Sequence, residues 1–183
     1  MSRPVVCIDG PSGSGKGTLA RSIARKLGWA YLDSGAIYRV LALKVARAGL
    51  ADDSAADAAS GLDLRFDIES NAVWLDGENV GSEIRTEEAG AGASRLAVRS
   101  DVRAALLKLQ QEFAEPQSLV ADGRDMGTVV FPESSCKIFL EASAEERAQR
   151  RHQELIQAGK DANFDQIYRD ICARDERCLL YTS

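Results

Sequence analysis

The stretch VVCIDGPSGSGKGTL, from Val5 to Leu19, decides the fold of this chain. A short apolar, β-branched run ends at Asp9, a glycine-rich turn follows, and Lys16 opens an amphipathic run. This is the order of strand, loop and helix that a phosphate-binding loop requires. Glycines let backbone N–H groups approach an anion without Cβ clashes, and the helix adds its own unpaired N-terminal N–H groups. The stretch therefore predicts binding of a nucleoside triphosphate.

The loop departs from the common pattern at one position. The usual order Gly-Lys-Ser/Thr is here Lys16-Gly17-Thr18, so position 17 has no hydroxyl to bind Mg²⁺ directly. We therefore expect Mg²⁺ among waters and phosphate oxygens, with Thr18 as a contact through water. The alternative, a glycine-rich turn without a ligand, is disfavoured because spacing, lysine and both flanking elements agree. The predicted nucleotide-binding residues of the loop are Gly10, Pro11, Ser12, Gly13, Ser14, Gly15, Lys16, Gly17 and Thr18.

Composition and charge narrow the classes of function. The chain has 183 residues, 45% of them hydrophobic, which is enough to bury a core and favours one domain over residues 1–183. A formal net charge of −5 argues against broad binding to nucleic acids or anionic membranes. The four cysteines lack metal-ligand spacing, and a single histidine disfavours a protein metal cage. We expect a cytoplasmic monomer without nucleic-acid or membrane partners.

The first half of the chain alternates between helical and strand patterns. Helices are predicted over 16–27 and 36–48, with a strand over 29–32 between them. The expected apolar stripe of the first helix is Leu19, Ile23 and Leu27. Asp33 or Ser34 can cap the second helix. Near the start of that helix, Arg39 can point over the phosphate loop, although taken alone it would be a solvated surface arginine.

Residues 62–80 change to a period of two, with turns at Ser70-Asn71 and Asp76-Gly77. They predict a small antiparallel meander inside an otherwise alternating chain. With the residues that follow, it forms an insertion over about 62–92, which is either a spacer or a cover for an acceptor. A helical pattern over 82–113 follows, and its expected core positions are Val98, Val102, Leu106 and Leu109.

A second informative stretch runs from Ser118 to Asp125. A buried parallel strand ends at Asp122, and a Gly-Arg-Asp turn follows. Ligands of open α/β sheets lie at the carboxyl ends of strands, so this turn is expected to face the phosphate loop. Asp122 is placed to orient hydrated Mg²⁺, Arg124 to bind a phosphate, and Asp125 to accept from an amine or a ribose hydroxyl. A further core strand is predicted over 136–140.

The last third predicts two helices rich in arginine. Ser143 and Glu146 form a capping box, and a second helix begins at Phe164. The arginines of the two helices are Arg147, Arg150, Arg151, Arg169, Arg174 and Arg177. We interpret the pair as a mobile lid, centred on about 151–166, that brings charge to a transferring phosphoryl group. The alternative is a charged hairpin whose arginines pair with Glu145, Asp170 and Asp175.

Together these motifs closely resemble the bacterial cytidylate kinases, which are nucleoside monophosphate kinases. The blocks that carry the resemblance are GPSGSGKGT at 10–18, LDSGAIYR at 32–39, GSEIRTEE at 81–88, ADGRDMGTVVFP at 121–132 and KIFLEASAEERAQRR at 137–151. The resemblance runs from about Val5 to Arg177. It implies an α/β fold, a phosphate-loop parallel sheet flanked by helices, with an antiparallel β insertion that binds the acceptor and a helical lid.

The resemblance also implies the reaction and the roles of single residues. It implies transfer of the γ-phosphoryl group of ATP to CMP or dCMP with Mg²⁺, with Arg150 and Arg151 near ATP. By matching positions, the residues that read cytosine or line its pocket are Ser34, Ser94, Arg103 and Asp125. Those that act on the phosphates, and so count as catalytic, are Lys16, Arg39, Arg124 and Arg174. Other readings stay open: a kinase for UMP, AMP or a non-nucleotide acceptor, or a module that binds ATP without transferring phosphate.

The chain departs from the family pattern after Arg177. The family continues with an Asp-Arg-Asn-Arg-like run, in which an aspartate holds the ribose hydroxyls, whereas this chain has Cys178 at that place and continues as Leu-Leu-Tyr-Thr-Ser. By this comparison the family's last strand and helix are absent. Loss of an edge strand leaves backbone groups unpaired and core surface exposed. The resemblance therefore implies a chain that is truncated, weakly stable and poorly active.

This expectation of weak stability predicts the outcome of thermal unfolding. We expect the far-ultraviolet circular dichroism of the purified chain to lose its signal in a broad transition below about 45 °C, the lower end of the usual range for mesophile domains. A cooperative transition at about 45–65 °C would contradict it.

Overall fold

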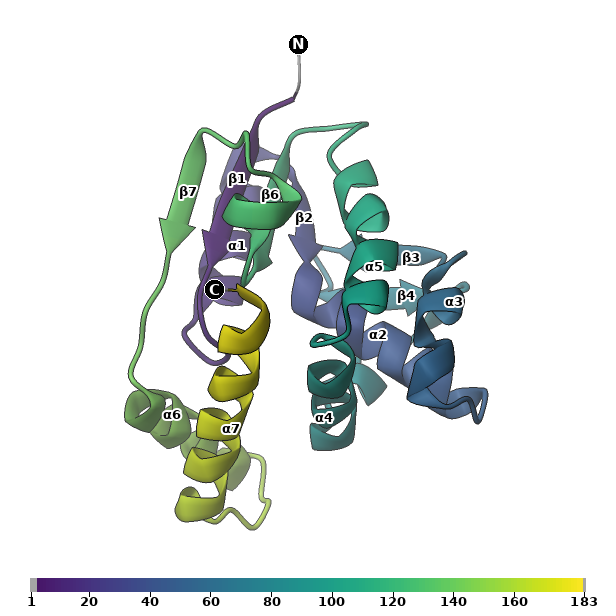
Figure 1. Ribbon diagram of the computed structural model, residues 1–183. Coiled ribbons are helices and arrows are strands. Elements are labelled where there is room, and N and C mark those ends of the chain that lie inside the picture. The colour runs from purple at the N-terminus through teal and green to yellow at the C-terminus, as the bar shows by residue number, and fades with distance from the viewer. Residues whose placement is uncertain (1–2, 183) are drawn as a thin grey trace.

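The computed structural model describes residues 3–182, with backbone alone for 179–182. A parallel sheet forms its centre, in the order β2-β6-β1-β7 (Figure 1). Its strands are β1 (Val5–Asp9), β2 (Ala30–Asp33), β6 (Leu119–Gly123) and β7 (Cys136–Phe139). The helices around it are α1 (Lys16–Leu27), α2 (Ser34–Arg47), α3 (Ala55–Ala59), α4 (Glu87–Leu96), α5 (Ser100–Glu112), α6 (Ala144–Gln157) and α7 (Phe164–Thr182). The predicted α/β class is confirmed.

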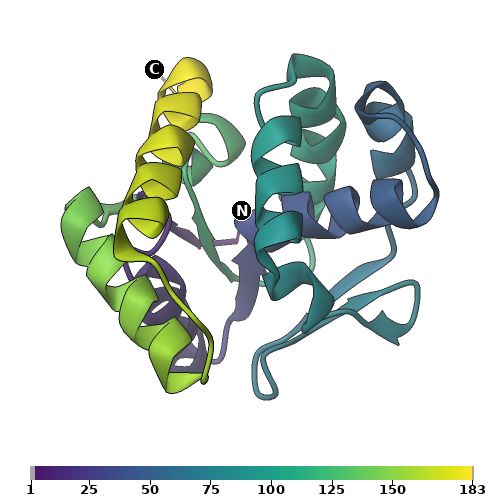
Figure 2. The ribbon, with the colours of Figure 1, turned by 90° about the horizontal axis from the view of Figure 1, so that it is seen from below.

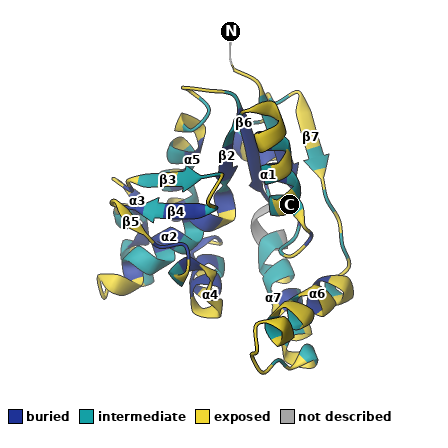
Figure 3. Cartoon of the chain, turned by 180° about the vertical axis from the view of Figure 1, so that it is seen from behind, coloured by how far each residue is buried: buried dark blue, intermediate teal, exposed yellow. Residues whose placement is uncertain are grey.

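The two middle strands carry the core, because parallel strands inside a sheet are covered on both faces. All five residues of β6 are buried (Figure 3). Alternate residues of β6 point to opposite faces. Leu119 belongs to the large apolar cluster that includes Ile37 and Leu106 of α2 and α5, whereas Val120 belongs to the smaller cluster with Ala20 and Ala24 of α1. The parallel pairing of β1 with β6 inside this core places the carboxyl ends of the two strands side by side.

The prediction of a core strand over 136–140 is wrong about its burial. The strand exists as β7, but it pairs with β1 alone among the described residues and lies at the edge of the sheet. Cys136 is exposed, and Phe139 has 63% of its surface exposed. An apolar run of this length indicates a strand, but its place in the sheet depends on which partners pair with it.

Two predictions about helix faces need correction. Leu27 is exposed, and the buried residues of α1 are Ala20 and Ala24. Small residues lie where α1 packs on the sheet, so the large residues of the predicted stripe flank the contact. In the predicted run over 82–113, the structure has two helices, α4 and α5, and Val98 is exposed at the break between them. Val102 and Leu106 are fully buried, as predicted.

The predicted meander is confirmed as a three-stranded antiparallel sheet in the order β3-β4-β5. Its strands are β3 (Leu64–Asp67), β4 (Ala72–Leu75) and β5 (Glu78–Asn79). Phe66 of β3 connects it to the main body, since its ring lies 6.4 Å from that of Tyr31 on β2 and 5.7 Å from that of Phe113. The small sheet is therefore held beside the β2 edge of the main sheet.

Within the described residues, no helix combines the length and the apolar character that crossing a bilayer requires. The same residues contain no cluster of three or more His, Cys, Asp or Glu side chains fit to hold a metal ion.

Substitution of Gly10 tests whether the strand-to-loop turn has room for a side chain. Its φ is +154°, and a Cβ at this position would lie 2.2 Å from the carbonyl oxygen of Leu140. We expect Gly10→Ala to destabilise the chain by about 1–3 kcal/mol beyond the backbone strain, as overpacking does, measured by urea denaturation. Gly15→Ala is the matched control: Gly15 also has a positive φ, +94°, but a Cβ there meets nothing within 4 Å. Equal losses in the two variants would contradict the steric account.

Candidate active site

A cavity of about 600 Å³ opens at the carboxyl ends of β1, β2 and β6. The phosphate loop, α2, α4, the turn after β6 and the α6–α7 hairpin all contribute to its lining. Figure 2 shows α4 and α7 facing each other, and residues of both helices line the cavity. Such a position is where open α/β sheets bind ligands.

The two strand ends are tied together by a buried carboxylate. Asp9, the last residue of β1, accepts hydrogen bonds of 2.9 Å from the backbone N–H groups of Met126 and Gly127, in the turn after β6. Burial raises the pKa of Asp9, and the two N–H donors act against this rise. The carboxylate thus fixes the Gly-Arg-Asp turn against the phosphate loop.

The phosphate loop curls over Lys16 and contacts α6. The Nζ of Lys16 donates to the carbonyl oxygen of Pro11 at 3.2 Å, and burial lowers the pKa of the ammonium group. Arg147 donates to the carbonyl of Ser12, and Arg150 lies 3.4 Å from the carbonyl of Gly13. The loop is therefore held in its curled form by α6 as well as by its own glycines.

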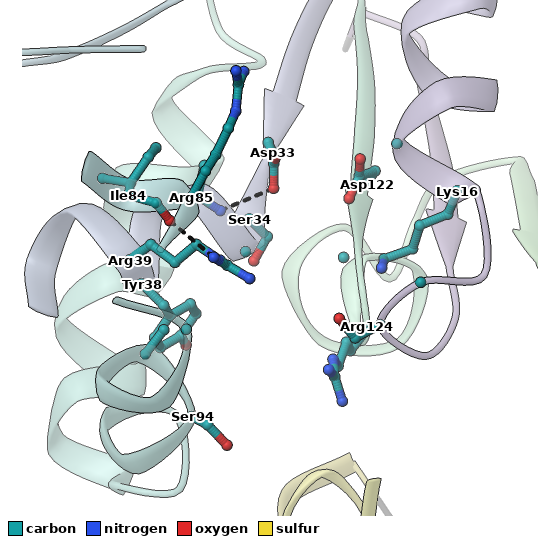
Figure 4. Close-up of a pocket in the computed structure, with 18 of the residues that line it drawn as sticks. Lys16, Asp33, Ser34, Tyr38, Arg39, Ile84, Arg85, Ser94, Asp122 and Arg124 are labelled. Atoms are coloured by element: carbon teal, nitrogen blue, oxygen red, sulfur yellow. Dashed lines mark hydrogen bonds between the residues drawn. The ribbon is translucent and has the colours of Figure 1, made fainter. Parts of the chain in front are cut away.

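Asp122 lies next to the amino end of α1 (Figure 4). Its Oδ2 accepts a hydrogen bond of 2.7 Å from the hydroxyl of Tyr31, and only 4% of its surface is exposed. Burial, together with the nearby Asp33, raises the pKa of Asp122 to about 7, and Lys16 acts against this shift. A Cβ at position 17 would lie 3.0 Å from that Oδ2. Gly17 therefore gives Asp122 room beside the loop.

Further along the cavity, polar side chains are paired in a recess between α2, α5 and β6. Arg103 and Asp125 form an ion pair of 2.6 Å with 18% and 11% of their side chains exposed. Ser34 donates to Oε1 of Gln110 at 2.7 Å. Tyr38 lines the same recess, and burial raises the pKa of its hydroxyl to about 12. The recess thus offers an oriented carboxylate, a cation and hydroxyl groups to a polar ring.

Several arginines surround the opening between the loop and the recess. Arg39 of α2 donates to the carbonyl of Ile84 at 2.8 Å, and burial and the neighbouring Arg174 lower the pKa of its guanidinium (Figure 4). Arg124, after β6, points into the same space (Figure 4). Arg151 and Arg174 both pair with Glu87 of α4.

The structure brings most of the predicted site residues to one cavity. Those that line it are Ser12, Gly13, Lys16, Gly17, Ser34, Arg39, Ser94, Arg103, Asp122, Arg124, Asp125, Arg151 and Arg174. The predicted site residues that do not line it are Gly10, Pro11, Ser14, Gly15, Thr18 and Arg150. Thr18 lines a neighbouring hollow with Arg21 and Ser22.

Sequence reasoning missed three supporting side chains: Tyr31, Glu87 and Gln110. Each contacts a predicted residue from a distant part of the chain, as Tyr31 does across 91 residues to Asp122. No spacing rule connects such pairs. One ion pair of the alternative interpretation, a charged hairpin, is present: Arg147 pairs with Asp175 and joins α6 to α7.

Comparison with known proteins agrees with this geometry. A sequence profile of the cytidylate kinase family matches residues 6–178. The cytidylate kinase of Chromobacterium violaceum is 53% identical over 178 residues, which cover 97% of this chain and 80% of the relative. Those of Aeromonas salmonicida and Bordetella bronchiseptica are each 53% identical, covering 95% of this chain and 78% of each relative. The chain belongs to the cytidylate kinase family.

Members of this family are phosphotransferases that phosphorylate CMP and dCMP. The predicted family, fold class and reaction class are therefore confirmed. The alternative interpretations, a kinase for another acceptor and a module that only binds ATP, are not favoured. The block at 32–39 contributes Ser34 and Arg39 to the lining of the cavity, and the block at 121–132 contributes Asp122, Arg124 and Asp125.

The residues present fit a magnesium ion that is held mainly by nucleotide and water. The carboxylate of Asp122 lies beside Gly17 of the loop, and the described residues form no metal cage. Such a site suits Mg²⁺, which keeps several waters and binds through one or two carboxylates and phosphate oxygens.

Tyr31→Phe tests whether the orientation of Asp122 matters. We expect a decrease in kcat of about 3–10-fold and a loss of about 1 kcal/mol in the free energy of unfolding, because one buried hydrogen bond is lost. Steady-state kinetics and urea denaturation measure the two effects. Tyr168→Phe on α7, where the side chain is half-exposed and does not line the cavity, is the matched control. An unchanged kcat in Tyr31→Phe would show that the hydrogen bond is dispensable.

Proposed function

We propose that the chain transfers the γ-phosphoryl group of ATP to CMP and dCMP within the cavity described above, with Mg²⁺ bound to the nucleotide phosphates. Membership of the cytidylate kinase family carries this proposal. The meeting of the phosphate loop, the Arg103–Asp125 recess and several arginines in one cavity supports it.

The donor side is built from the loop and α6. Backbone N–H groups of the loop and the amino end of α1 face the phosphates of ATP, and Lys16 supplies a positive charge to the β and γ oxygens. Arg150 of α6 lies 3.4 Å from the carbonyl oxygens of Gly13 and Ser14 in the loop, and Arg151 is the second arginine of α6 that we propose to act on ATP. When bound, Mg²⁺ offsets charge on the phosphate oxygens; Asp122 is the residue that would hold it, through water.

The acceptor side is built from α2, α4, α5 and the turn after β6. Asp125 and Arg103 offer an acceptor and a donor to the edge of cytosine, with Ser34 and Ser94 beside them. Arg39, Arg124 and Arg174 bind the acceptor phosphate. The insertion at about 62–92 covers the acceptor, and the hairpin around 151–166 acts as a lid that excludes water.

The chemistry needs positioning and charge neutralisation more than covalent participation. The acceptor phosphate is already anionic at neutral pH, so no side chain has to remove a proton from the nucleophile. The cavity is lined by arginines and one lysine, which can neutralise phosphate charge, and by several carboxylates and hydroxyl groups; His152, the chain's single histidine, is not part of the lining. We further propose that the chain acts as a cytoplasmic monomer.

An acceptor panel tests the proposed function directly. ADP release from MgATP is measured with CMP, dCMP, UMP, AMP or no acceptor. We expect turnover with CMP and dCMP and at least tenfold lower kcat/KM with AMP, because a purine does not satisfy the paired groups of the recess. Preference for AMP would contradict the assignment of the recess to cytosine. Turnover without an acceptor would indicate an ATPase.

A further inference from the structure

A carboxylate occupies the place among the arginines where an acceptor phosphate is expected. Glu87, at the first position of α4, accepts from Arg151 of α6 at 2.6 Å through Oε1 and from Arg174 of α7 at 2.8 Å through Oε2. The two oxygens of one carboxylate thus bind two arginines from the opposite side of the cavity, and all three residues line it.

A third guanidinium lies at the same point. A Cβ at Gly90, one helical turn after Glu87, would lie 3.3 Å from Nη2 of Arg174 and 3.4 Å from Nη2 of Arg39. The guanidinium groups of α2 and α7 therefore converge above Gly90. Like charges this close repel one another, and a counter-charge offsets the repulsion.

Glu87 supplies that counter-charge. Partial burial acts to raise its pKa, but the hydrogen bonds from Arg151 and Arg174 outweigh this and keep the pKa below its ordinary value. The Glu87 carboxylate is also the most open of the three groups to solvent: 62% of its side chain is exposed, against 19% for Arg174 and 36% for Arg151. Its ion pairs are thus open to competition from a stronger anion.

A phosphate is such an anion. It carries more negative charge than a carboxylate and offers three oxygens to guanidinium groups. We propose that Glu87 is an internal substitute for the acceptor phosphate: it holds Arg151 and Arg174 in place in the empty site and must release at least Arg174 when CMP binds. The inference rests on the proposed function in one respect, namely that Arg174 binds the acceptor.

The consequence is that Glu87 lowers the affinity for CMP. A bound phosphate competes with the Glu87 carboxylate for Arg174 and is repelled by it. Removing the negative charge of Glu87 removes both the competition for Arg174 and the repulsion of the phosphate. If instead Glu87 only positioned the arginines for the substrate, its removal would weaken binding. The two roles predict opposite signs.

Glu87→Gln decides between them. We expect KM for CMP, and Kd for CMP by isothermal titration calorimetry, to fall by about threefold to tenfold, the effect of losing one or two partly exposed ion pairs. The thermal midpoint of unfolding should change little, because Glu87 is mostly exposed. An unchanged or higher Kd for CMP would overturn the inference. Glu87→Ala repeats the test without an amide that could bind the arginines.

Glu88→Gln is the matched control. Glu88 is the next residue, also lies in the first turn of α4 and is exposed. Glu88→Gln changes the net charge by the same amount as Glu87→Gln, and both glutamates lie near the amino end of the helix, where negative charge is favourable. We expect Kd for CMP to stay within twofold of the wild type. An equal fall in both variants would show a general charge effect and overturn the specific role of Glu87.

An Arg174→Ala background separates the inference from the proposed function. If Arg174 binds the acceptor phosphate, Arg174→Ala alone raises KM for CMP, and adding Glu87→Gln gives a smaller fall than in the wild-type background. An unchanged KM in Arg174→Ala contradicts the proposed role of Arg174. A full-sized fall on adding Glu87→Gln to Arg174→Ala contradicts exchange through Arg174.

Discussion

The parallel pairing of β1 and β6 is the constraint on which the site depends. The pairing runs in register from Val5 beside Leu119 to Asp9 beside Gly123, so both strands end at the same level. Asp9 then binds the backbone of the turn that follows β6. A phosphate loop and a Gly-Arg-Asp turn more than 100 residues apart in the chain therefore meet at one edge. The side chains proposed to act on phosphate line the cavity at this end of the sheet.

The second organising feature is the balance of charge in the cavity. Buried cations and carboxylates are costly unless they are paired or hydrogen-bonded, and here three arginines are paired with carboxylates of other elements. Arg103 is paired with Asp125, Arg147 with Asp175, and Arg174 with Glu87. Each pair joins two different elements of the structure. Under the proposed function, these ion pairs are contacts that substrates would replace or extend.

The arginines show where a prediction from sequence reaches its limit. A capping box and helical spacing placed Arg147, Arg150 and Arg151 on one helix, and the structure confirms that helix. The helical spacing did not indicate the partners of these arginines. Arg147 reaches the loop at Ser12, and Arg151 reaches Glu87, 64 residues away. Spacing along a helix defines which residues share a face, whereas the partner depends on how that face packs.

By itself, the sequence determined the phosphate loop, the α/β class, the antiparallel insertion and the residues of the family blocks. These follow from local patterns: glycine placement, apolar periodicity and turn chemistry act within a few residues. Only the tertiary structure decided that β7 lies at the sheet edge, that Gly17 leaves room for Asp122, and that Glu87 pairs with two arginines of the cavity. The physical reason is that edge position, close approach and ion pairing are relations between distant segments, and they exist only after the strands and helices have packed.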